Sequence, residues 1–201
     1  GLYIKNSTLT VKEFDINNNS SGDYGGGIYS YSENGGAGTI FRDGKIHSNN
    51  SSDCGAGLMC TDCDCIILNV SVKNNYGNQS GGGLCFFGSN SLIENVDIIS
   101  NQAGGGGGGI RFWGSGTNTL LQNVKIIKNS AYQAGGIYFD NCSAQTFENV
   151  VVAENNASYN GGGCAFNNSP VSLSGLSIIN NYSTTASGIN IAYSDVTINE
   201  S

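Results

Sequence analysis

The feature that most constrains the fold of this chain is an internal repeat of about 26 residues. A motif of the form apolar-x-apolar-x-x-Asn begins seven times, at steps of 26 to 30 residues. Its third position is always Ile or Val, and its last position is always asparagine, at Asn19, Asn49, Asn75, Asn101, Asn129, Asn155 and Asn181. A repeat of this length and regularity indicates a stack of equivalent structural units.

Each repeat contains three short segments in which apolar and other residues alternate, such as residues 9–11, 14–16 and 28–31. Alternation with a period of two is typical of β-strands with one buried face. Antiparallel hairpins of such short strands would not align the same residue types in every repeat. A chain that coils and climbs one strand spacing, about 4.8 Å, per turn would align them. The sequence therefore predicts an all-β, single-stranded parallel β-helix of about eight rungs, forming one domain over residues 1–201.

Glycine runs precede the buried Ile or Leu of the third segment, as at residues 25–27, 81–83 and 161–163. We expect them at a sharp corner, where glycine adopts conformations closed to residues with a Cβ atom. The runs do not indicate a phosphate-binding loop, because they recur in nearly every turn and no Lys-Ser/Thr pair or helical pattern follows them. We expect the asparagine column to stack into a ladder of side-chain hydrogen bonds.

Two segments carry a resemblance to a known family: residues 124–139 (VKIIKNSAYQAGGIYF) and residues 150–166 (VVVAENNASYNGGGCAF). They resemble right-handed parallel β-helix repeats of the pectin-lyase-like superfamily, closest in style to polymorphic outer-membrane-protein and autotransporter-adhesin repeats. The resemblance covers nearly the whole chain and implies a right-handed coil. It does not specify a function, because that superfamily includes lyases, hydrolases, tailspikes, adhesins and inert spacers.

Polysaccharide-degrading members of that superfamily use paired carboxylates, or a basic residue beside calcium-binding acids. The Asp-Asp, His-Gly and Arg-x-Lys motifs of the galacturonase-like members are absent from this sequence. The only histidine, His47, is interpreted as a surface turn residue. We therefore expect no enzyme, no catalytic residue and no cofactor. The alternative that stays open is a carbohydrate-binding or polysaccharide-degrading β-helix.

A candidate ligand-binding surface lies on the outward side of the third segment. Tyr29, Arg111 and Tyr138 occupy equivalent outward positions, and Trp113 lies two residues beyond Arg111. Aromatic rings on a flat, rigid face suit stacking on sugars or on another β-helix. The same residues are also common in strands for their propensity alone, so a purely structural role is the competing interpretation.

Seven cysteines leave at least one without a partner inside the chain. Cys54, Cys60, Cys63 and Cys65 are the disulfide candidates, because they lie close together and such staples are common in oxidising compartments. A metal site is the alternative at this cluster. We expect none, since the aspartates between these cysteines would mix hard ligands with soft ones.

Twelve Asn-x-Ser/Thr sequons occur, although a chain rich in Asn, Ser and Thr also forms sequons by chance. Two of them, at Asn18 and Asn49, immediately precede another sequon. The candidates for N-glycosylation are Asn6, Asn19, Asn50, Asn69, Asn78, Asn141, Asn156, Asn167, Asn181 and Asn199.

Charge and hydropathy exclude some partners. Eight basic and 15 acidic residues give a net charge of −7, which argues against nucleic-acid binding, and no apolar run approaches the roughly 18 residues of a membrane span. Residues 1–4 match the middle of a rung and residues 195–201 match the opening of the next one, so we expect a segment of a longer chain or a filament subunit. We expect a non-enzymatic, N-glycosylated rod of an extracellular or cell-surface fibre, stalk or adhesin, whose partners are glycans, flanking repeats or further copies stacked end to end.

Overall fold

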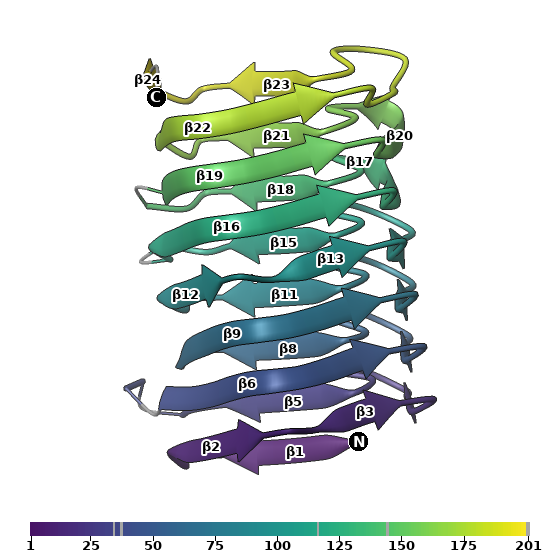
Figure 1. The fold of residues 1–201 in the computed structure, drawn as a ribbon, viewed down its shortest axis with the longest axis vertical. Coiled ribbons are helices and arrows are strands. Elements are labelled where there is room, and N and C mark those ends of the chain that lie inside the picture. Colours follow the sequence, from purple (N-terminus) through teal and green to yellow (C-terminus); the bar gives the residue numbers. More distant parts are fainter. Residues whose placement is uncertain (34, 37, 116, 144, 200–201) are drawn as a thin grey trace.

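The structure is a computed structural model that describes residues 1–199 apart from 34, 37, 116 and 144. Over these residues it contains β-strands and no helix, and the strands pair in parallel from turn to turn (Figure 1). The predicted all-β parallel coil is therefore confirmed, with about seven turns of about 26 residues. The expected eight rungs are close to this number, because one of the sheets contains eight strands.

Three sheets run the length of the coil. Sheet A consists of β1 (Leu2–Lys5), β5 (Ile28–Tyr31), β8 (Leu58–Thr61), β11 (Leu84–Phe87), β15 (Ile110–Trp113), β18 (Ile137–Asp140), β21 (Cys164–Asn167) and β23 (Ile189–Ala192). Sheet B consists of β2 (Leu9–Lys12), β3 (Asp15–Asn17), β6 (Gly38–His47), β9 (Asp64–Lys73), β12 (Ser91–Glu94), β13 (Asp97–Ile99), β16 (Thr119–Ile127), β19 (Gln145–Ala153), β22 (Val171–Ile179) and β24 (Val196–Asn199). Sheet C consists of β4 (Ser20–Ser21), β7 (Asn50–Ser51), β10 (Tyr76–Gly77), β14 (Gln102–Ala103), β17 (Ser130–Gln133) and β20 (Asn156–Asn160).

The sequence predicts three segments per turn, but it assigns them to sheets differently. Two of the predicted segments belong to sheet B, where five turns join them into one bent strand (β6, β9, β16, β19 and β22). The third predicted segment is sheet A. Sheet C is not anticipated, because its strands are only two to five residues long and carry no readable alternation.

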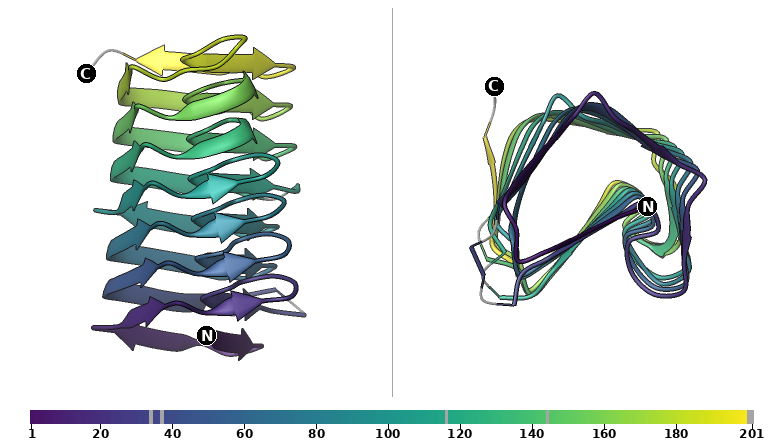
Figure 2. Two further views of the ribbon diagram at one scale, coloured as in Figure 1. Left: turned by 90° about the vertical axis from the view of Figure 1, so that its right-hand side faces the viewer. Right: turned by 90° about the horizontal axis from the view of Figure 1, so that it is seen from below.

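Viewed along its axis, the coil has a wide loop and a narrow hook (Figure 2). The wide loop is formed by sheets A and B, and its interior is filled by columns of like residues. The stacked rings of Phe86, Phe112, Phe139 and Phe166 are fully buried there, with centroids 4.7 to 5.4 Å apart. The hook carries sheet C and returns the chain to the start of the next strand of sheet A. Stacking of identical residues therefore builds the core one turn at a time.

Four positions in a typical turn take the left-handed backbone conformation that most residues avoid. They lie at the bend of sheet B, directly before the ladder asparagine, three residues before the strand of sheet A, and directly after that strand. In one turn these residues are Asn95, Ser100, Gly107 and Gly114, with φ angles of 53°, 56°, 68° and 99°. Asparagine and glycine tolerate this region best, which explains their abundance.

The glycine runs combine two requirements. The third residue before each strand of sheet A from β5 to β23 has a positive φ, as expected for a corner, although Ala134 and Ala186 take this place in two turns. The residue directly before the strand is glycine in every turn for a different reason, which is close backbone packing. A Cβ atom added at Gly83 would lie 2.6 Å from the carbonyl oxygen of Gly109 in the next turn.

Candidate functional site

The asparagine column forms a continuous hydrogen-bonded ladder at the corner between sheets B and C. The backbone N–H and Nδ2 of Asn75 both donate to Oδ1 of Asn101, at 3.0 and 2.9 Å. Nδ2 of Asn101 also donates to the carbonyl oxygen of Val72 in the preceding turn, at 3.0 Å. The same pattern links Asn19, Asn49, Asn75, Asn101, Asn129, Asn155 and Asn181. The ladder satisfies polar groups that are almost completely buried in its middle five members.

The ladder conflicts with glycosylation at two of the candidate sequons. A glycan replaces one of the two hydrogens on Nδ2. At Asn19 both are engaged, with the carbonyl oxygen of Asn17 and with Oδ1 of Asn49. At Asn181, Nδ2 donates to the carbonyl oxygen of Val152, and Oδ1 accepts from Asn155, so the amide is fixed inside the corner. Ladder membership and glycosylation are alternative roles for these two residues, and the structure places both amides in the ladder.

The asparagines of the other candidate sequons lie at the surface. Asn50 and Asn156 are exposed in sheet C, and Asn78 is exposed directly after β10. The remaining candidates occupy corners, bends and strand ends, and all of them are exposed except the half-buried Asn167: Asn6, Asn69, Asn141, Asn167 and Asn199. The sequon of Asn199 extends into residues 200–201, which lie outside the described residues.

The predicted aromatic surface on sheet A is interrupted. In the sheet register its outward column runs Tyr3, Tyr29, Met59, Cys85, Arg111, Tyr138, Ala165 and Asn190. Met59 and Cys85 are buried, because the hook packs over this side of the sheet. Tyr29 is therefore separated from Arg111 and Tyr138, and the four predicted residues form no single flat face.

Arg111 is held between two aromatic rings. Its guanidinium carbon lies 5.0 Å from the ring centre of Trp113 and 5.2 Å from that of Tyr138. Its nitrogens also contact Oγ of Ser80 at 2.5 Å and a carboxylate oxygen of Asp140 at 3.4 Å. Burial raises the pKa of the Tyr138 hydroxyl. The guanidinium group and the rings of this cluster contact one another, which favours the structural interpretation of these residues.

A second aromatic surface, which the sequence reasoning missed, lies on sheet C and at its edge. The rings of Tyr132 and Tyr159 stack with centroids 5.6 Å apart and planes 9° apart, and the residues are 53% and 48% exposed. A shallow hollow of about 270 Å³ beside them is lined by Ala103, Gly104, Ala131 and Tyr132 together with the polar residues Gln102, Ser130, Asn156 and Ser158. The position of these tyrosines shortly after the ladder asparagine is the sequence signal that could have identified them.

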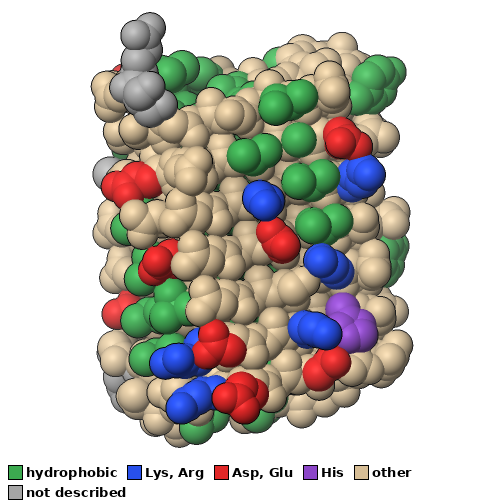
Figure 3. Space-filling model, in the orientation of Figure 1, with side chains coloured by type: hydrophobic (Ala, Val, Ile, Leu, Met, Phe, Trp, Pro, Cys, Tyr) green, Lys and Arg blue, Asp and Glu red, His purple; other side chains and the backbone are tan. Residues whose placement is uncertain are grey.

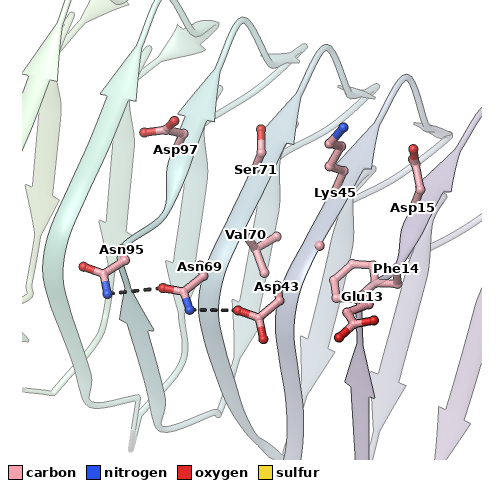
Figure 4. Close-up of a pocket in the computed structure, with 11 residues that line it drawn as sticks. Glu13, Phe14, Asp15, Asp43, Lys45, Asn69, Val70, Ser71, Asn95 and Asp97 are labelled. Carbon is pink, nitrogen blue, oxygen red and sulfur yellow. Dashed lines mark hydrogen bonds between the residues drawn. The ribbon is translucent and has the colours of Figure 1, made fainter.

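A groove of about 660 Å³ crosses the outer face of sheet B at its bend (Figure 4). One side is a row of hydrogen bonds in which Nδ2 of Asn95 donates to Asn69 at 3.3 Å and Nδ2 of Asn69 donates to Asp43 at 2.9 Å. The opposite row reads Asp15, Lys45, Ser71 and Asp97 in the sheet register. Over this face, charged side chains gather mainly on the N-terminal turns and hydrophobic ones on the C-terminal turns (Figure 3).

Two carboxylates of this groove, Asp15 and Asp97, are too far apart to act as a pair in glycoside hydrolysis. Asp15 and Asp97 lie three strand spacings apart, about 14 Å, which exceeds the roughly 5 to 9.5 Å between a catalytic pair. The hydrogen bond from Asn17 is the main cause that lowers the pKa of Asp15, and the hydrogen bond from Asn69 is the main cause that lowers that of Asp43. A general acid needs a raised pKa instead. His47 lies beside the groove with Nε2 2.9 Å from Asp15.

One motif of the galacturonase-like kind is present at this groove and was overlooked in the sequence. Asn95 and Asp97 have the Asn-x-Asp spacing. Asn95 donates to Asn69 within the outer row, and the register opposes Asp97 to Ser71 and Lys125. The Asn-x-Asp spacing therefore places no second carboxylate directly opposite Asp97 in the sheet register.

The cysteine cluster lies inside the coil, where sulfur atoms from sheets A and B meet. Cys60 and Cys65 form a disulfide. Cys63 and Cys54, the other two disulfide candidates, carry free thiols. The three sulfurs of Cys60, Cys63 and Cys65 lie within 4.8 Å of one another, a grouping that could hold a soft metal ion if all three were reduced. The disulfide withdraws two of them, and burial raises the pKa of the Cys63 thiol.

The part of the chain that the structure describes has no helix long and apolar enough to cross a membrane. Comparisons with protein families, with curated proteins and with solved structures found no match. The parallel β-solenoid fold is therefore established by the structure alone, without a family assignment.

Proposed function

We propose that this chain is a non-enzymatic structural rod of an extracellular or cell-surface fibre, stalk or adhesin, clad in N-linked glycans. The observation that carries the proposal is the buried asparagine ladder, in which the same polar residue hydrogen-bonds each turn to the next. Repetition of one stabilising contact suits a rod, whereas a catalytic site needs a local departure from the repeat.

The surface supports the same function. Exposed sequons recur along one side of the coil, at Asn50, Asn78 and Asn156 in or beside sheet C, where a glycan would project away from the core. The strand directions in Figure 1 support the right-handed coil that the resemblance to pectin-lyase-like repeats implies, as does the preference of parallel crossover connections for that hand. Kinship with autotransporter-type repeats remains part of this proposal.

The test is glycopeptide mass spectrometry on protein from its native source. We expect glycans at Asn50, Asn78 and Asn156, and bare amides at Asn19, Asn49 and Asn181, because the ladder fixes these three. A chain without any glycan would overturn the glycosylated rod. Glycans on ladder positions would show that the corner opens during synthesis and would contradict the rigid ladder.

A second function, carbohydrate binding, is favoured by one specific observation: the exposed, stacked pair Tyr132 and Tyr159 beside amide and hydroxyl groups. Parallel rings of this kind stack on the apolar faces of sugars. Binding of soluble polysaccharides should fall at least tenfold in Tyr132→Ala and should stay unchanged in Trp113→Ala, since Trp113 packs against Arg111 and Phe87. Equal binding by both variants would rule out the sheet C tyrosines as a sugar platform.

A further inference from the structure

The hook of each turn contacts sheet A of the following turn through one repeated pair of positions. Nη1 of Arg111 donates to Oγ of Ser80, 31 residues earlier, at 2.5 Å. In the next turn, a Cβ atom on Gly106 would lie 2.5 Å from Cδ1 of Tyr138. These pairs place a hook residue directly against the outward side chain of the next strand of sheet A. The repeat therefore brings a fixed pair of side chains together in successive turns.

In the turn before Ser80 and Arg111, the same two positions are Cys54 and Cys85. Cys54 lies in the hook and forms a β-bridge with Ser80, and Cys85 precedes Arg111 in the outward column of sheet A. The two cysteines are also 31 residues apart. Together with Met59 they form a small cluster separate from the main core, in which Cys54 is 6% exposed and Cys85 is fully buried.

The two side chains belong to the same packed cluster, in which Sγ of Cys54 also donates to Oδ1 of Asp53 at 3.0 Å. Burial is the largest cause that raises the pKa of Cys85 well above its ordinary value, and a hydrogen bond with Cys54 is the second. Two buried cysteines of one cluster, one from the hook and one from sheet A of the following turn, are candidates for a disulfide. The hook backbone is fixed on both sides, since the N–H of Gly25 donates to Cys54 and that of Gly55 donates to Ser80.

We propose that Cys54 and Cys85 form a second disulfide, which fastens the hook of one turn to sheet A of the next. This inference rests on the proposed extracellular location, because both cysteines are free thiols in the structure and an oxidant is required. The cross-link encloses 31 residues, against 5 for Cys60–Cys65, so it restricts the unfolded chain more strongly.

A low-molecular-weight disulfide such as oxidised glutathione supplies the oxidising equivalents. The Cys54 thiolate, on the less buried side of the pair, attacks one sulfur of glutathione disulfide and releases one reduced glutathione. The Cys85 thiolate then attacks Sγ of Cys54 in the mixed disulfide and releases the second glutathione. Two protein thiols lose two electrons and two protons, and one glutathione disulfide becomes two thiols.

The test equilibrates the purified chain in a glutathione redox buffer, unfolds it in denaturant without reductant, and counts thiols by alkylation and mass spectrometry. We expect three free thiols, namely two fewer than the five that accompany Cys60–Cys65 alone, and a cross-linked peptide that joins Cys54 to Cys85. Five alkylated thiols, or a peptide that joins Cys54 to Cys63, would overturn the proposal.

Matched variants separate the pairing from a general effect of losing a thiol. Cys85→Ser should remove the cross-linked peptide and lower the melting temperature of the oxidised protein by about 4 to 8 °C. The control Cys142→Ser also removes a buried thiol, but it should keep the cross-link. If the disulfide forms in the redox buffer while protein from the native source carries both thiols free, the proposed oxidising location fails and the pairing geometry stands.

Discussion

Two columns of asparagine repeat along sheet B with the same period and yet depend on different parts of the residue. The ladder asparagines are buried, and each amide joins three turns, as Asn101 does with Asn75, Asn129 and Val72. The bend asparagines are exposed and have φ angles of 53° to 54°, as at Asn95 and Asn123. The bend amides also pair, as Nδ2 of Asn149 does with Oδ1 of Asn123 at 2.7 Å, but they do so at exposed positions. The ladder therefore depends mainly on the amide group, whereas the bend depends mainly on the left-handed backbone.

The sequence itself supports this distinction. Glu13, Asp43 and Gly175 occupy the bend position in other turns, all with positive φ angles. The ladder position accepts only asparagine in its seven turns. A buried hydrogen-bonding site tolerates substitution far less than a surface bend does, because unpaired groups left in the interior keep their full desolvation cost.

The largest effect that would test this contrast is expected for Asn101→Ala. The change leaves the backbone N–H of Asn75 and the carbonyl oxygen of Val72 without their side-chain partner in the interior. It also removes one of the two hydrogen bonds to Oδ1 of Asn129, while the backbone N–H of residue 101 keeps the other. We expect the free energy of unfolding, measured by urea denaturation, to fall by about 3 to 5 kcal/mol. A loss below about 1 kcal/mol, the size expected at an exposed site, would show that the ladder contributes little.

The second test concerns the glycine that packs against the ladder. In Gly83→Ala the new Cβ would lie 2.6 Å from the carbonyl oxygen of Gly109 and 3.1 Å from the amide of Asn101. We expect a loss of about 2 to 3 kcal/mol from overpacking. Gly22→Ala is the matched control, because a Cβ atom at Gly22 would meet no atom within 4 Å. The contrast fails if thermal denaturation shows the control to be the more damaging change.

The third test uses the pH dependence of stability to examine two thiols in the interior. Burial raises the pKa of Cys164 to about 12 and that of Cys142 to about 11. Between pH 9 and these values the unfolded chain releases protons that the folded chain keeps, so stability is complete below pH 9 and decreases as the pH rises. Each thiol should contribute a slope of up to about 1.4 kcal/mol per pH unit.

Cys164→Val isolates this contribution, since valine suits the apolar column of Ile137 and Ile189. Denaturation midpoints measured from pH 8 to pH 11 should decrease less steeply in the variant than in the parent chain. Parallel decreases in the two proteins would mean that Cys164 ionises as easily in the folded chain as in the unfolded one.

The smallest effect is expected at the bend. Asn123→Ala places a Cβ-bearing residue without a helpful side chain in the left-handed region and should cost about 1 kcal/mol. Asn123→Gly keeps that conformation accessible and should change the free energy of unfolding by no more than about 0.5 kcal/mol. Chemical denaturation of the two variants side by side separates the backbone requirement from the amide, and a larger loss in the glycine variant would favour the amide.

The predictable part of this molecule is the part that repeats. Parallel pairing, the buried columns and the position of the ladder follow from residues such as Ile98 and Asn101, whose equivalents recur in each turn. Sheet C could not be predicted, because strands as short as Tyr76–Gly77 carry no alternation. The interruption of the aromatic column on sheet A could not be predicted for a related reason: Met59 and Cys85 are outward in the sheet but covered by the hook, a packing relation that strand alternation alone cannot reveal.

The disulfide illustrates the limit of spacing as evidence. Four candidates lie within twelve residues, and spacing alone does not distinguish their pairings. The choice depends on which side chains face one another across the interior, here Cys60 from sheet A and Cys65 from sheet B. The pair Cys54 and Cys85 could not be predicted from the sequence for the same reason, since only the offset between the hook and the next turn brings the two residues together.

The ladder also aligns a series of side-chain amide dipoles along the axis of the coil. In every step the amide oxygen of one asparagine accepts from the turn before it, as Oδ1 of Asn129 accepts from Asn101. The amide carbonyl dipoles therefore point the same way along the axis, and their oxygen ends all face the N-terminal turns. Two copies that met head to head would bring oxygen against oxygen, whereas head-to-tail contact continues the series. An assembly that extends the ladder is consequently directional and open-ended, a filament whose two ends differ.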